Sequence, residues 1–377
     1  MEKPFNSYKN VTFITTLNHN VGDDFVREGL KYLIKQKFQN QQFNFYNIHK
    51  HTPITSRFGF ESLRRNRIGK ILDDLLPSSF TKDKILNADL IIQSGAPFFW
   101  CHDIDNNHCF ANEWYHPLIK KRYSQTQNVP LLNLAVGTCQ AYHSNGVEFC
   151  EKCKQYITDF YKLSTVTTVR DSLSNRILSN INLPTTVIPC SSIFAVDEYG
   201  IVGEKGEYIV VNFMEGGAHY VFGQSIDFEK WERTFSNFYF EIKKKNRVVF
   251  VCHDIKELNA AKRIDPQGEF FYKKDDYVAY MKFYSRAKMG IMNRVHGAFL
   301  LAGFGKPSII IGNDTRALMA NEIGLKCFFV NDVTKELLLA NYEMLIKEVD
   351  HYKSLLFDIK HKTFKNYQNI AFEGVEI

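Results

Sequence analysis

The stretch from Lys288 to Asp314 reads KMGIMNRVHGAFLLAGFGKPSIIIGND, in which two short apolar runs flank a segment of small and apolar residues. Runs such as KMGIM and SIIIG are typical of strands buried in parallel sheets. The segment between them, GAFLLAG, consists of small and apolar residues, which is typical of a helix buried on all sides. The stretch therefore predicts a strand–helix–strand unit, with Arg294 and His296 at the point where the first strand ends.

The same alternation of β-rich runs and helical segments recurs along the chain and predicts parallel sheets covered by helices. In the first half the predicted strands are 11–16, 43–48, 89–94, 130–136, 165–170 and 185–190. In the second half they are 208–213, 247–252, 269–272, 288–292, 308–312 and 327–330. We therefore predict an α/β protein with two Rossmann-like domains that face each other across a cleft.

Residues 195–207, AVDEYGIVGEKGE, carry three glycines and mixed charge without periodicity, which indicates a linker or a loop between domains. We place the boundary there, with one α/β domain over 1–195 and another over 196–377. Helices are predicted over 23–38, 61–76, 117–123 and 147–163 in the first domain. One or two terminal helices over 334–369 are expected to pack back across the domains.

The charge balance suits an anionic small molecule better than a nucleic acid. Lys plus Arg number 47 against 41 Asp plus Glu, for a net charge of +6. The basic residues are dispersed, and no nucleic-acid-binding motif accompanies them. The start of the sequence has no apolar segment typical of export, and no apolar run of about 18 residues follows. We expect a cytoplasmic protein, able to work at the inner face of the membrane.

Eight cysteines in a chain of this kind favour reduced thiols over a disulfide framework. Cys150 and Cys153 form a C-x-x-C motif, which leaves two interpretations open. One is a structural zinc site, and the other is packing on the buried face of a helix. For the chemistry of the protein, we expect that no metal and no cofactor takes part.

Polar residues and glycines gather where the predicted strands end, which is where open parallel sheets bind ligands. Asp23 is a candidate helix cap, and the glycines let a ligand approach the backbone. The candidate residues lining the cleft are Asn20, Gly22, Asp23, Gly95, Gly137, Thr138, Glu215, Gly217, His253 and Asp254.

A second set consists of cation-capable side chains and a helix N-terminus. Arg170, Arg294, His296 and Arg316 follow strands, and Gly297 opens a helix whose dipole favours an anion. Several positive groups in one cleft repel one another and need an anion to offset that cost. The set predicts a small ligand with more than one negative group, gripped by guanidinium forks.

At these motifs the sequence resembles the polysaccharide pyruvyl transferase family. The resemblance is carried by N-x-G-D at Asn20–Asp23, R-D-x-x-S at Arg170–Ser174, C-H-D at Cys252–Asp254 and R-V-H-G at Arg294–Gly297, which runs on into G-K-P-S-I-I-I at Gly305–Ile311. Members of that family have two-domain folds of the GT-B type. Here Gly95-Ala96-Pro97 stands where a glycine run is expected, followed by the aromatic residues 98–100.

The resemblance implies a pyruvyltransferase that uses phosphoenolpyruvate as donor and a sugar of a cell-surface polysaccharide, exopolysaccharide or capsule, free or lipid-linked, as acceptor. Its product is a cyclic pyruvate ketal, and phosphate is released. Arg170, Arg294, His296, Gly297 and Arg316 are then the donor-binding residues, with His296 as the proton donor for the enol carbon. The general base is left open among Asp23, Glu215 and Asp254.

Three other functions compete with this interpretation. A GT-B glycosyltransferase needs a carboxylate for the ribose of a nucleotide sugar, for which Glu322 or Asp314 are candidates. A metal-dependent transferase is suggested only by Asp103-Ile104-Asp105, in a His-rich segment. A binding protein without catalysis is disfavoured by the clustered Arg170, Arg294 and His296.

Overall fold

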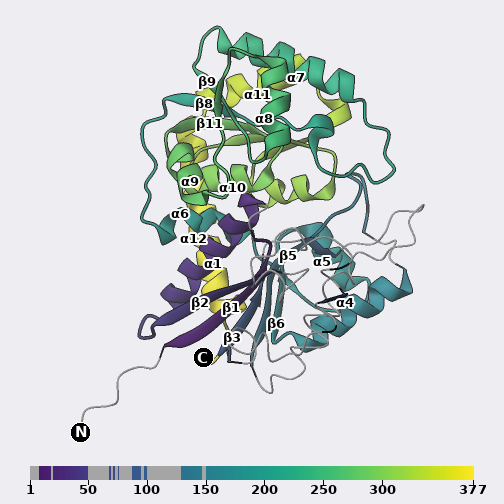
Figure 1. The fold of residues 1–377 in the computed structure, drawn as a ribbon, viewed down its shortest axis with the longest axis vertical. Helices are drawn as coiled ribbons and strands as arrows, with labels where there is room; N and C mark the ends of the chain where they lie inside the picture. Colours follow the sequence, from purple (N-terminus) through teal and green to yellow (C-terminus); the bar gives the residue numbers. More distant parts are fainter. Residues whose placement is uncertain are drawn as a thin grey trace.

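The structure, a computed structural model, describes residues 8–17, 20–49, 68, 71–72, 75, 87–94, 97–99, 129–146 and 150–377. Two parallel sheets lie in two halves of the molecule, each accompanied by helices (Figure 1). The two-domain α/β architecture expected from the alternating pattern is therefore confirmed. The helix predicted over 117–123 lies outside the described residues, as does most of the one over 61–76.

The first sheet has the strand order β2-β1-β3-β5-β6-β7, with β4 paired to β5, and its pairings are parallel. Its strands are β1 (Lys9–Thr15), β2 (Phe43–His49), β3 (Leu90–Gln93), β4 (Pro97–Phe99), β5 (Leu131–Thr138), β6 (Val166–Val169) and β7 (Thr186–Val187). Its helices are α1 (Val21–Lys37), α4 (Glu151–Leu163) and α5 (Ser172–Ser179). Every strand predicted for this half is present, and β4 is an addition.

The second sheet has the order β10-β9-β8-β11-β12-β13, the Rossmann order, also with parallel pairings. Its strands are β8 (Tyr208–Val211), β9 (Val248–Val251), β10 (Glu269–Phe271), β11 (Ala287–Met292), β12 (Ser308–Gly312) and β13 (Lys326–Phe329). Its helices are α7 (Phe228–Lys243), α8 (Ile255–Ile264), α9 (Tyr277–Ser285), α10 (Val295–Gly303), α11 (Lys335–Lys347) and α12 (Val349–Asn366). Shorter turns are η7 (Glu215–Gly217), η8 (Thr315–Ile323), η9 (Val330–Asp332) and the π-helical η10 (Tyr367–Ala371). The strand order reverses between β8 and β11, which is where such sheets bind ligands.

The segment between the sheets is more regular than the expected loop. It begins with the turn η6 (Ser191–Phe194) and the short helix α6 (Ala195–Glu198), which the buried Ala195 and Val196 hold in place. Two glycines make room for this segment. A Cβ atom at Gly29 of α1 would lie 1.9 Å from the Ser191 carbonyl oxygen, and one at Gly303 of α10 would lie 2.5 Å from that of Ile193. The linker is thus packed between helices of both halves, and a boundary near residue 195 stays a prediction.

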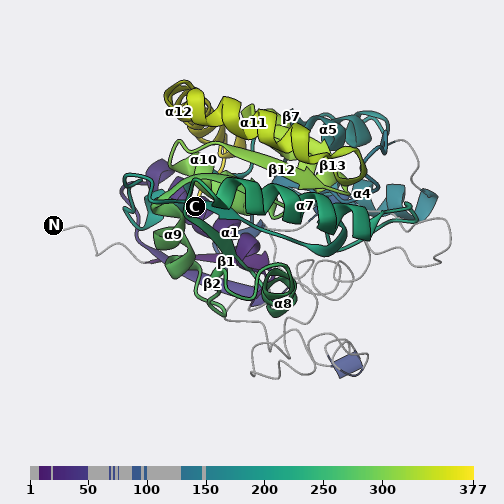
Figure 2. The same ribbon diagram turned by 90° about the horizontal axis from the view of Figure 1, so that it is seen from above.

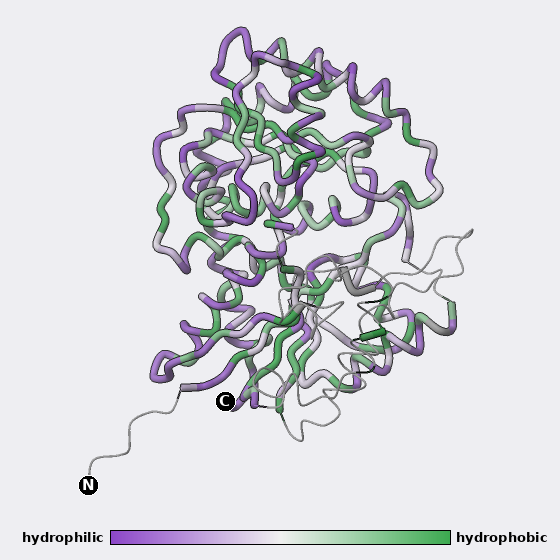
Figure 3. Tube along the Cα trace, in the orientation of Figure 1, coloured by the Kyte–Doolittle hydropathy of each residue, from purple (hydrophilic) through white to green (hydrophobic). Residues whose placement is uncertain are grey.

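A continuous apolar core joins the halves. Phe25 and Leu30 of α1 belong to the same buried cluster as Leu300 of α10, Leu356 of α12 and Tyr367 of η10. Helices α11 and α12 run along one side of the molecule (Figure 2). In the Cα tube coloured by hydropathy, hydrophobic residues gather along the strands in the interior (Figure 3). The segment after α12 reaches the first half, where the Tyr367 hydroxyl donates to the Pro189 carbonyl oxygen.

Hydrogen bonds also join the two sheets where β5 and β12 end. The backbone N–H of Thr315 donates to the carbonyl oxygen of Gln140 at 3.0 Å, and the N–H of Gln140 donates to Thr315 Oγ1 at 3.0 Å. Ala141 and Asp314 form an antiparallel bridge beside them. The carboxyl ends of the two sheets are therefore held next to each other.

Candidate functional site

The N-terminus of α10 lies at the centre of the candidate site. Arg294 caps this helix directly after β11, and its backbone N–H donates to Asn212 Oδ1, just beyond β8. Arg294 thus lies at the reversal of strand order in the second sheet. His296, half-buried, follows in the first turn, where the helix dipole favours an anion.

His296 contacts two elements of the first half. A Cβ atom at Gly22, in the first turn of α1, would lie 2.7 Å from His296 Nδ1, so only glycine allows the helix to approach this closely. On the other side, Arg170 Nη1 lies 3.5 Å from His296 Nε2. The predicted convergence of Gly22, Arg170 and His296 is therefore present in the structure.

Arg170 is a buried cation with few partners. Its side chain follows β6, the residue is 2% exposed, and its Nε lacks a hydrogen-bond partner among the described residues. The Asp171 carboxylate stands at 3.9 Å from that atom, at the outer limit of an ion pair. A Cβ atom at Gly137 would lie 2.2 Å from Arg170 Nε, so the guanidinium rests directly on the bare backbone at the end of β5. This geometry leaves Arg170 able to take an anionic partner.

Arg294, in contrast, is held by two carboxylates. Its Nε donates to Glu257 Oε1 at 2.6 Å, and its Nη2 donates to Asp254 Oδ2 at 2.8 Å. Arg316 forms a fork with Asp314, at 3.0 Å from Nε and 2.5 Å from Nη2. The repulsion expected among the cationic groups is therefore partly offset within the protein, because Arg294 faces Asp254 and Glu257 and Arg316 faces Asp314. Among the three arginines, the positive charge of Arg170 is the least compensated.

Burial and the arginines together set the charge state of the two histidines. Burial, and then the charges of Arg170, Arg316 and Arg294, lower the pKa of His296 well below its usual value. The pKa of His253 is lowered in the same way by burial, Arg294 and His296. Both rings are therefore neutral near pH 7 in the protein without a ligand. An anion among the arginines would remove part of this effect and favour the protonated form of His296.

His253 lies behind His296 in a largely aromatic setting. Its Nε2 is 2.9 Å from the Tyr284 hydroxyl, and its Nδ1 has no partner in the described part of the chain. Tyr284 also packs on α10, because a Cβ atom at Gly297 would lie 2.7 Å from its hydroxyl oxygen. Gly297 is thus needed for close packing, whereas the helix itself begins at Val295, two residues before the predicted start.

The other residues predicted from the sequence have different roles in the structure, and some of them lie away from the centre of the site. Asn20, and not Asp23, caps α1, because Asn20 Oδ1 accepts from the N–H of Gly22 at 3.1 Å while Asp23 lies inside the first turn. Asp254 caps α8 as well as binding Arg294, and Glu215 pairs with Arg263 on the exposed surface at 2.7 Å. Thr138 is buried at the end of β5. Gly217, at φ 82°, packs against Val330. Gly95 and the D-x-D segment lie outside the described residues.

Glu257 organises the centre of the site and is not among the residues predicted from the sequence. This carboxylate is 4% exposed and accepts from Asn212 Nδ2, from the His253 N–H and from Arg294 Nε. Its position three residues after Asp254 resembles a capping box, which is the one signal the sequence offers. His219 and Tyr220 were missed as well, although they contact Arg294 and Arg316 respectively.

The described residues give little support to a metal site or a membrane span. No three His, Cys, Asp or Glu side chains gather as a metal site among them. Cys153 is fully buried in the core, which agrees with the packing interpretation of the C-x-x-C motif, whereas Cys150 is only partly buried and caps α4 with its Sγ. Within the same ranges, every helix is too short or too polar to cross a membrane.

Fold and site together define a two-domain α/β protein with a cluster of arginine and histidine side chains between the carboxyl ends of its sheets. Residues 20–315 match the family described as polysaccharide pyruvyl transferase. The chain belongs to this family, as the motifs indicated. Membership indicates, in general terms, a transferase that acts in polysaccharide pyruvylation. No functionally curated protein matches the sequence significantly.

Solved structures support the same architecture at low sequence identity. The S. aureus MnaA structure with UDP is 13% identical, with a TM-score of 0.54, covering 92% of this chain and 91% of that one. A putative UDP-N-acetylglucosamine 2-epimerase from Listeria monocytogenes is 10% identical, with a TM-score of 0.53 and coverage of 98% and 99%. A UDP-GlcNAc 2-epimerase from Neisseria meningitidis is 11% identical, with a TM-score of 0.50 and coverage of 92% and 94%. Likeness at such low sequence identity shows only that the chain shares the GT-B type of fold.

Proposed function

We propose that this protein transfers the pyruvyl group of phosphoenolpyruvate to a sugar of a cell-surface polysaccharide or its precursor. The product is a cyclic ketal, and phosphate is released. The observation that carries the proposal is the Arg170–His296 pair, in which a buried, weakly paired guanidinium lies 3.5 Å from a histidine whose pKa is lowered by burial and by three arginines. A donor with a carboxylate and a phosphate matches this surplus of positive charge.

The donor itself provides the means of charging His296. Its anionic groups offset Arg170 and the other arginines, so the pKa of His296 rises and the ring gains a proton. His296 then protonates C3 of the enol, and positive charge develops at C2. The first sugar hydroxyl bonds to C2, and the C2–O bond to phosphate breaks with its electron pair leaving on phosphate. The second hydroxyl closes the ketal, and the two hydroxyl protons restore His296 and leave with phosphate.

Among the carboxylates predicted as base candidates, two have other roles. Asp254 binds Arg294, and Glu215 binds Arg263 at the surface. We propose Asp23 as the base because it is 5% exposed and directly follows Gly22, whose backbone lies close against His296. Arg316, paired with Asp314, supports the donor phosphate through its remaining N–H groups. In this scheme no metal or cofactor takes part, and a lipid-linked acceptor would place the work beside the membrane.

The alternative of a nucleotide-sugar glycosyltransferase is less well supported. Its candidate ribose-binding carboxylates are both occupied, since Glu322 accepts from the backbone N–H and the hydroxyl of Ser172, and Asp314 holds Arg316. The nucleobase and ribose of a nucleotide sugar would have to displace these contacts.

Thermal unfolding with phosphoenolpyruvate, UDP-glucose or UDP-N-acetylglucosamine tests the proposal. A ligand at about 100 times its Kd stabilises a protein by roughly 2.7 kcal/mol. We expect a rise in Tm with phosphoenolpyruvate alone. Arg170→Lys should lose that rise, because a lysine cannot form the bidentate fork. His296→Asn should keep it but release no phosphate with any acceptor, and a rise in Tm only with the nucleotide sugars would refute the proposal.

A further inference from the structure

A loop of unusual backbone geometry lies next to the arginines. Residues 218–224 read AHYVFGQ and connect η7 to α7. Gly216, Gly217, Phe222 and Gly223, in this loop or beside it, have φ values of 66°, 82°, 50° and 70°. A positive φ is rare for a residue as bulky as Phe, and such strain is concentrated at functional positions. The loop is thus built to hold one particular shape.

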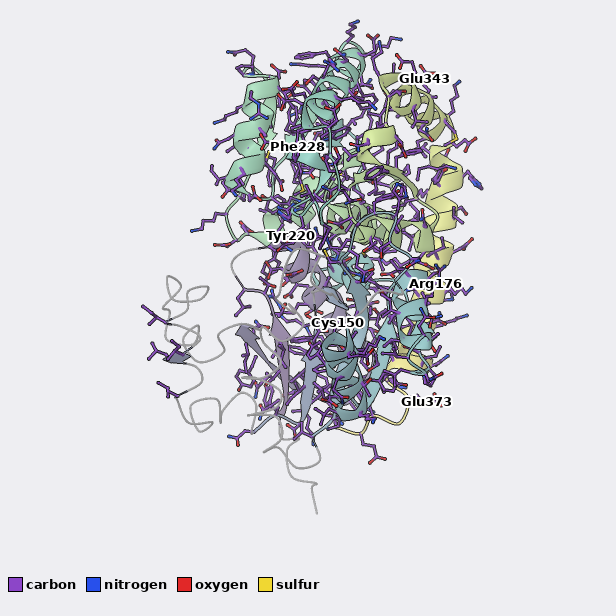
Figure 4. All side chains as sticks on the ribbon, turned by 90° about the vertical axis from the view of Figure 1, so that its right-hand side faces the viewer. Cys150, Arg176, Tyr220, Phe228, Glu343 and Glu373 are labelled. Atoms are coloured by element: carbon purple, nitrogen blue, oxygen red, sulfur yellow. The ribbon has the colours of Figure 1, made fainter. Side chains whose placement is uncertain are left out.

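The shape brings aromatic rings to the edge of the candidate site. Tyr220 is 45% exposed, and its ring centroid lies 5.7 Å from that of Phe222. In Figure 4, Tyr220 lies at the level where the two halves of the molecule meet. The described surface therefore presents a large aromatic ring beside the cationic centre.

Consecutive residues of this loop contact the arginines of the site. His219 Nε2 accepts from Arg294 Nη1 at 2.5 Å, and the Arg316 guanidinium lies over the Tyr220 ring at 5.6 Å from its centroid. At the other end of the loop, Gln224 Nε2 donates to the Asn313 carbonyl oxygen, and Gln224 Oε1 accepts from the N–H of Tyr142. The loop is fixed to both sheets.

We propose that Tyr220, supported by Phe222, is the platform on which the sugar ring of the acceptor stacks. This inference rests on the proposed function and adds to it the subsite for the acceptor. A cyclic ketal joins two hydroxyls on one edge of a pyranose, so that edge must face the donor while a face of the ring is available for contact. The apolar C–H face of a pyranose packs on an aromatic ring, and binding sites for small molecules commonly combine such rings with a few polar groups.

The position of the rings favours a sugar over a bilayer as the partner. A loop that inserts into lipid projects its aromatic residues away from the body of the protein. Tyr220 instead lies against Arg316, whose charge contributes to the lowered pKa of His296. A ring stacked on Tyr220 would thus lie beside the donor-binding groups.

Saturation-transfer NMR with the methyl glycosides of β-D-glucopyranose, β-D-galactopyranose and β-D-mannopyranose, in the presence of phosphoenolpyruvate, tests the platform. We expect at least one glycoside to bind the wild type and to bind Tyr220→Ala about tenfold more weakly, which corresponds to about 1.4 kcal/mol. Tyr220→Trp should retain binding because it keeps a flat ring. Phe240→Ala is the matched control, since Phe240 is 44% exposed on α7 and was not placed in the site.

Three outcomes would overturn the platform. They are equal glycoside binding by the wild type and Tyr220→Ala, no glycoside binding by the wild type, and a Tyr220-dependent association with phosphatidylglycerol vesicles without glycoside binding. The proposed function fails separately. If phosphoenolpyruvate does not raise the Tm while glycoside binding still depends on Tyr220, the donor assignment is wrong and the sugar platform stands.

Discussion

Replacing Gly137 with alanine should damage donor binding without unfolding the protein. The new Cβ atom would lie 2.2 Å from Arg170 Nε and 2.7 Å from its Cζ and Nη2, against 3.4 Å for an ordinary contact. The guanidinium therefore has to retreat by about 1 Å. Overpacking of this kind costs about 1–3 kcal/mol of stability, so we expect a lower Tm but a folded protein.

The effect on the donor follows from the bonds that Arg170 would no longer make. A hydrogen bond to a charged group contributes about 1.5–3 kcal/mol, so the Kd for phosphoenolpyruvate should rise by about 10- to 150-fold. Isothermal titration calorimetry on Gly137→Ala measures this directly. Gly203→Ala is the control, because its Cβ atom would lie 3.3 Å from Phe304, remote from the arginines. A Kd for Gly137→Ala within twofold of that control would refute the assignment of Arg170 to the donor.

Three further results are expected. Gly22→Ala would place a Cβ atom 2.7 Å from His296 Nδ1, and displacing a catalytic group by about 1 Å can lower kcat about 100-fold. The rate of phosphate release at saturating donor should show this loss, and an unchanged kcat would argue against His296 as the proton donor. Glu257→Gln removes a charge that Arg294 faces, so urea unfolding should show a free energy of unfolding lower by about 3 kcal/mol. The control Glu232→Gln breaks a surface ion pair and should lower the free energy of unfolding by less than about 1 kcal/mol. Equal losses would contradict the role of Glu257. The pKa of His296 is low in the free protein and, under the proposal, rises when the donor binds, so binding should take up a proton and strengthen as the pH falls through that raised pKa. Calorimetry in buffers of different ionisation enthalpy should show proton uptake that His296→Asn lacks, and equal uptake by that variant would place the proton elsewhere.

Much of the fold could be predicted from sequence because runs of β-branched and apolar residues are buried on both faces of the sheets. SIIIG at 308–312 is buried throughout, and it forms β12 with the predicted bounds. Arg170 and His296 could be found because they follow such runs directly. The helix at the start of the linker could not be predicted from the local sequence. Ala195 and Val196 become helical through burial between α1 and α10, which are distant from each other in sequence.

The sequence indicated which cationic residues lie at strand ends, but not which carboxylates they pair with. The sequence places Arg294 at a strand end, yet its carboxylate partners lie about 40 residues earlier, after β9. Glu257 looks like an ordinary acidic residue in the first turn of a helix. Its burial depends on Asn212 and on β8, β9 and β11 lying side by side, and that arrangement is a property of the sheet and not of any local motif.

The contact between the end of the chain and the first half bears on synthesis at the ribosome. Tyr367 and Phe372 belong to the same buried cluster as Phe25 and Leu30 of α1, and Gln368 Nε2 donates to the Leu33 carbonyl oxygen. When residues 8–190 have emerged, the segments that cover this face of α1 have yet to be translated. The part of α1 that contacts Tyr367, Gln368 and Phe372 therefore stays uncovered until this segment has been made, so the apolar core of the first half is completed only after the second half.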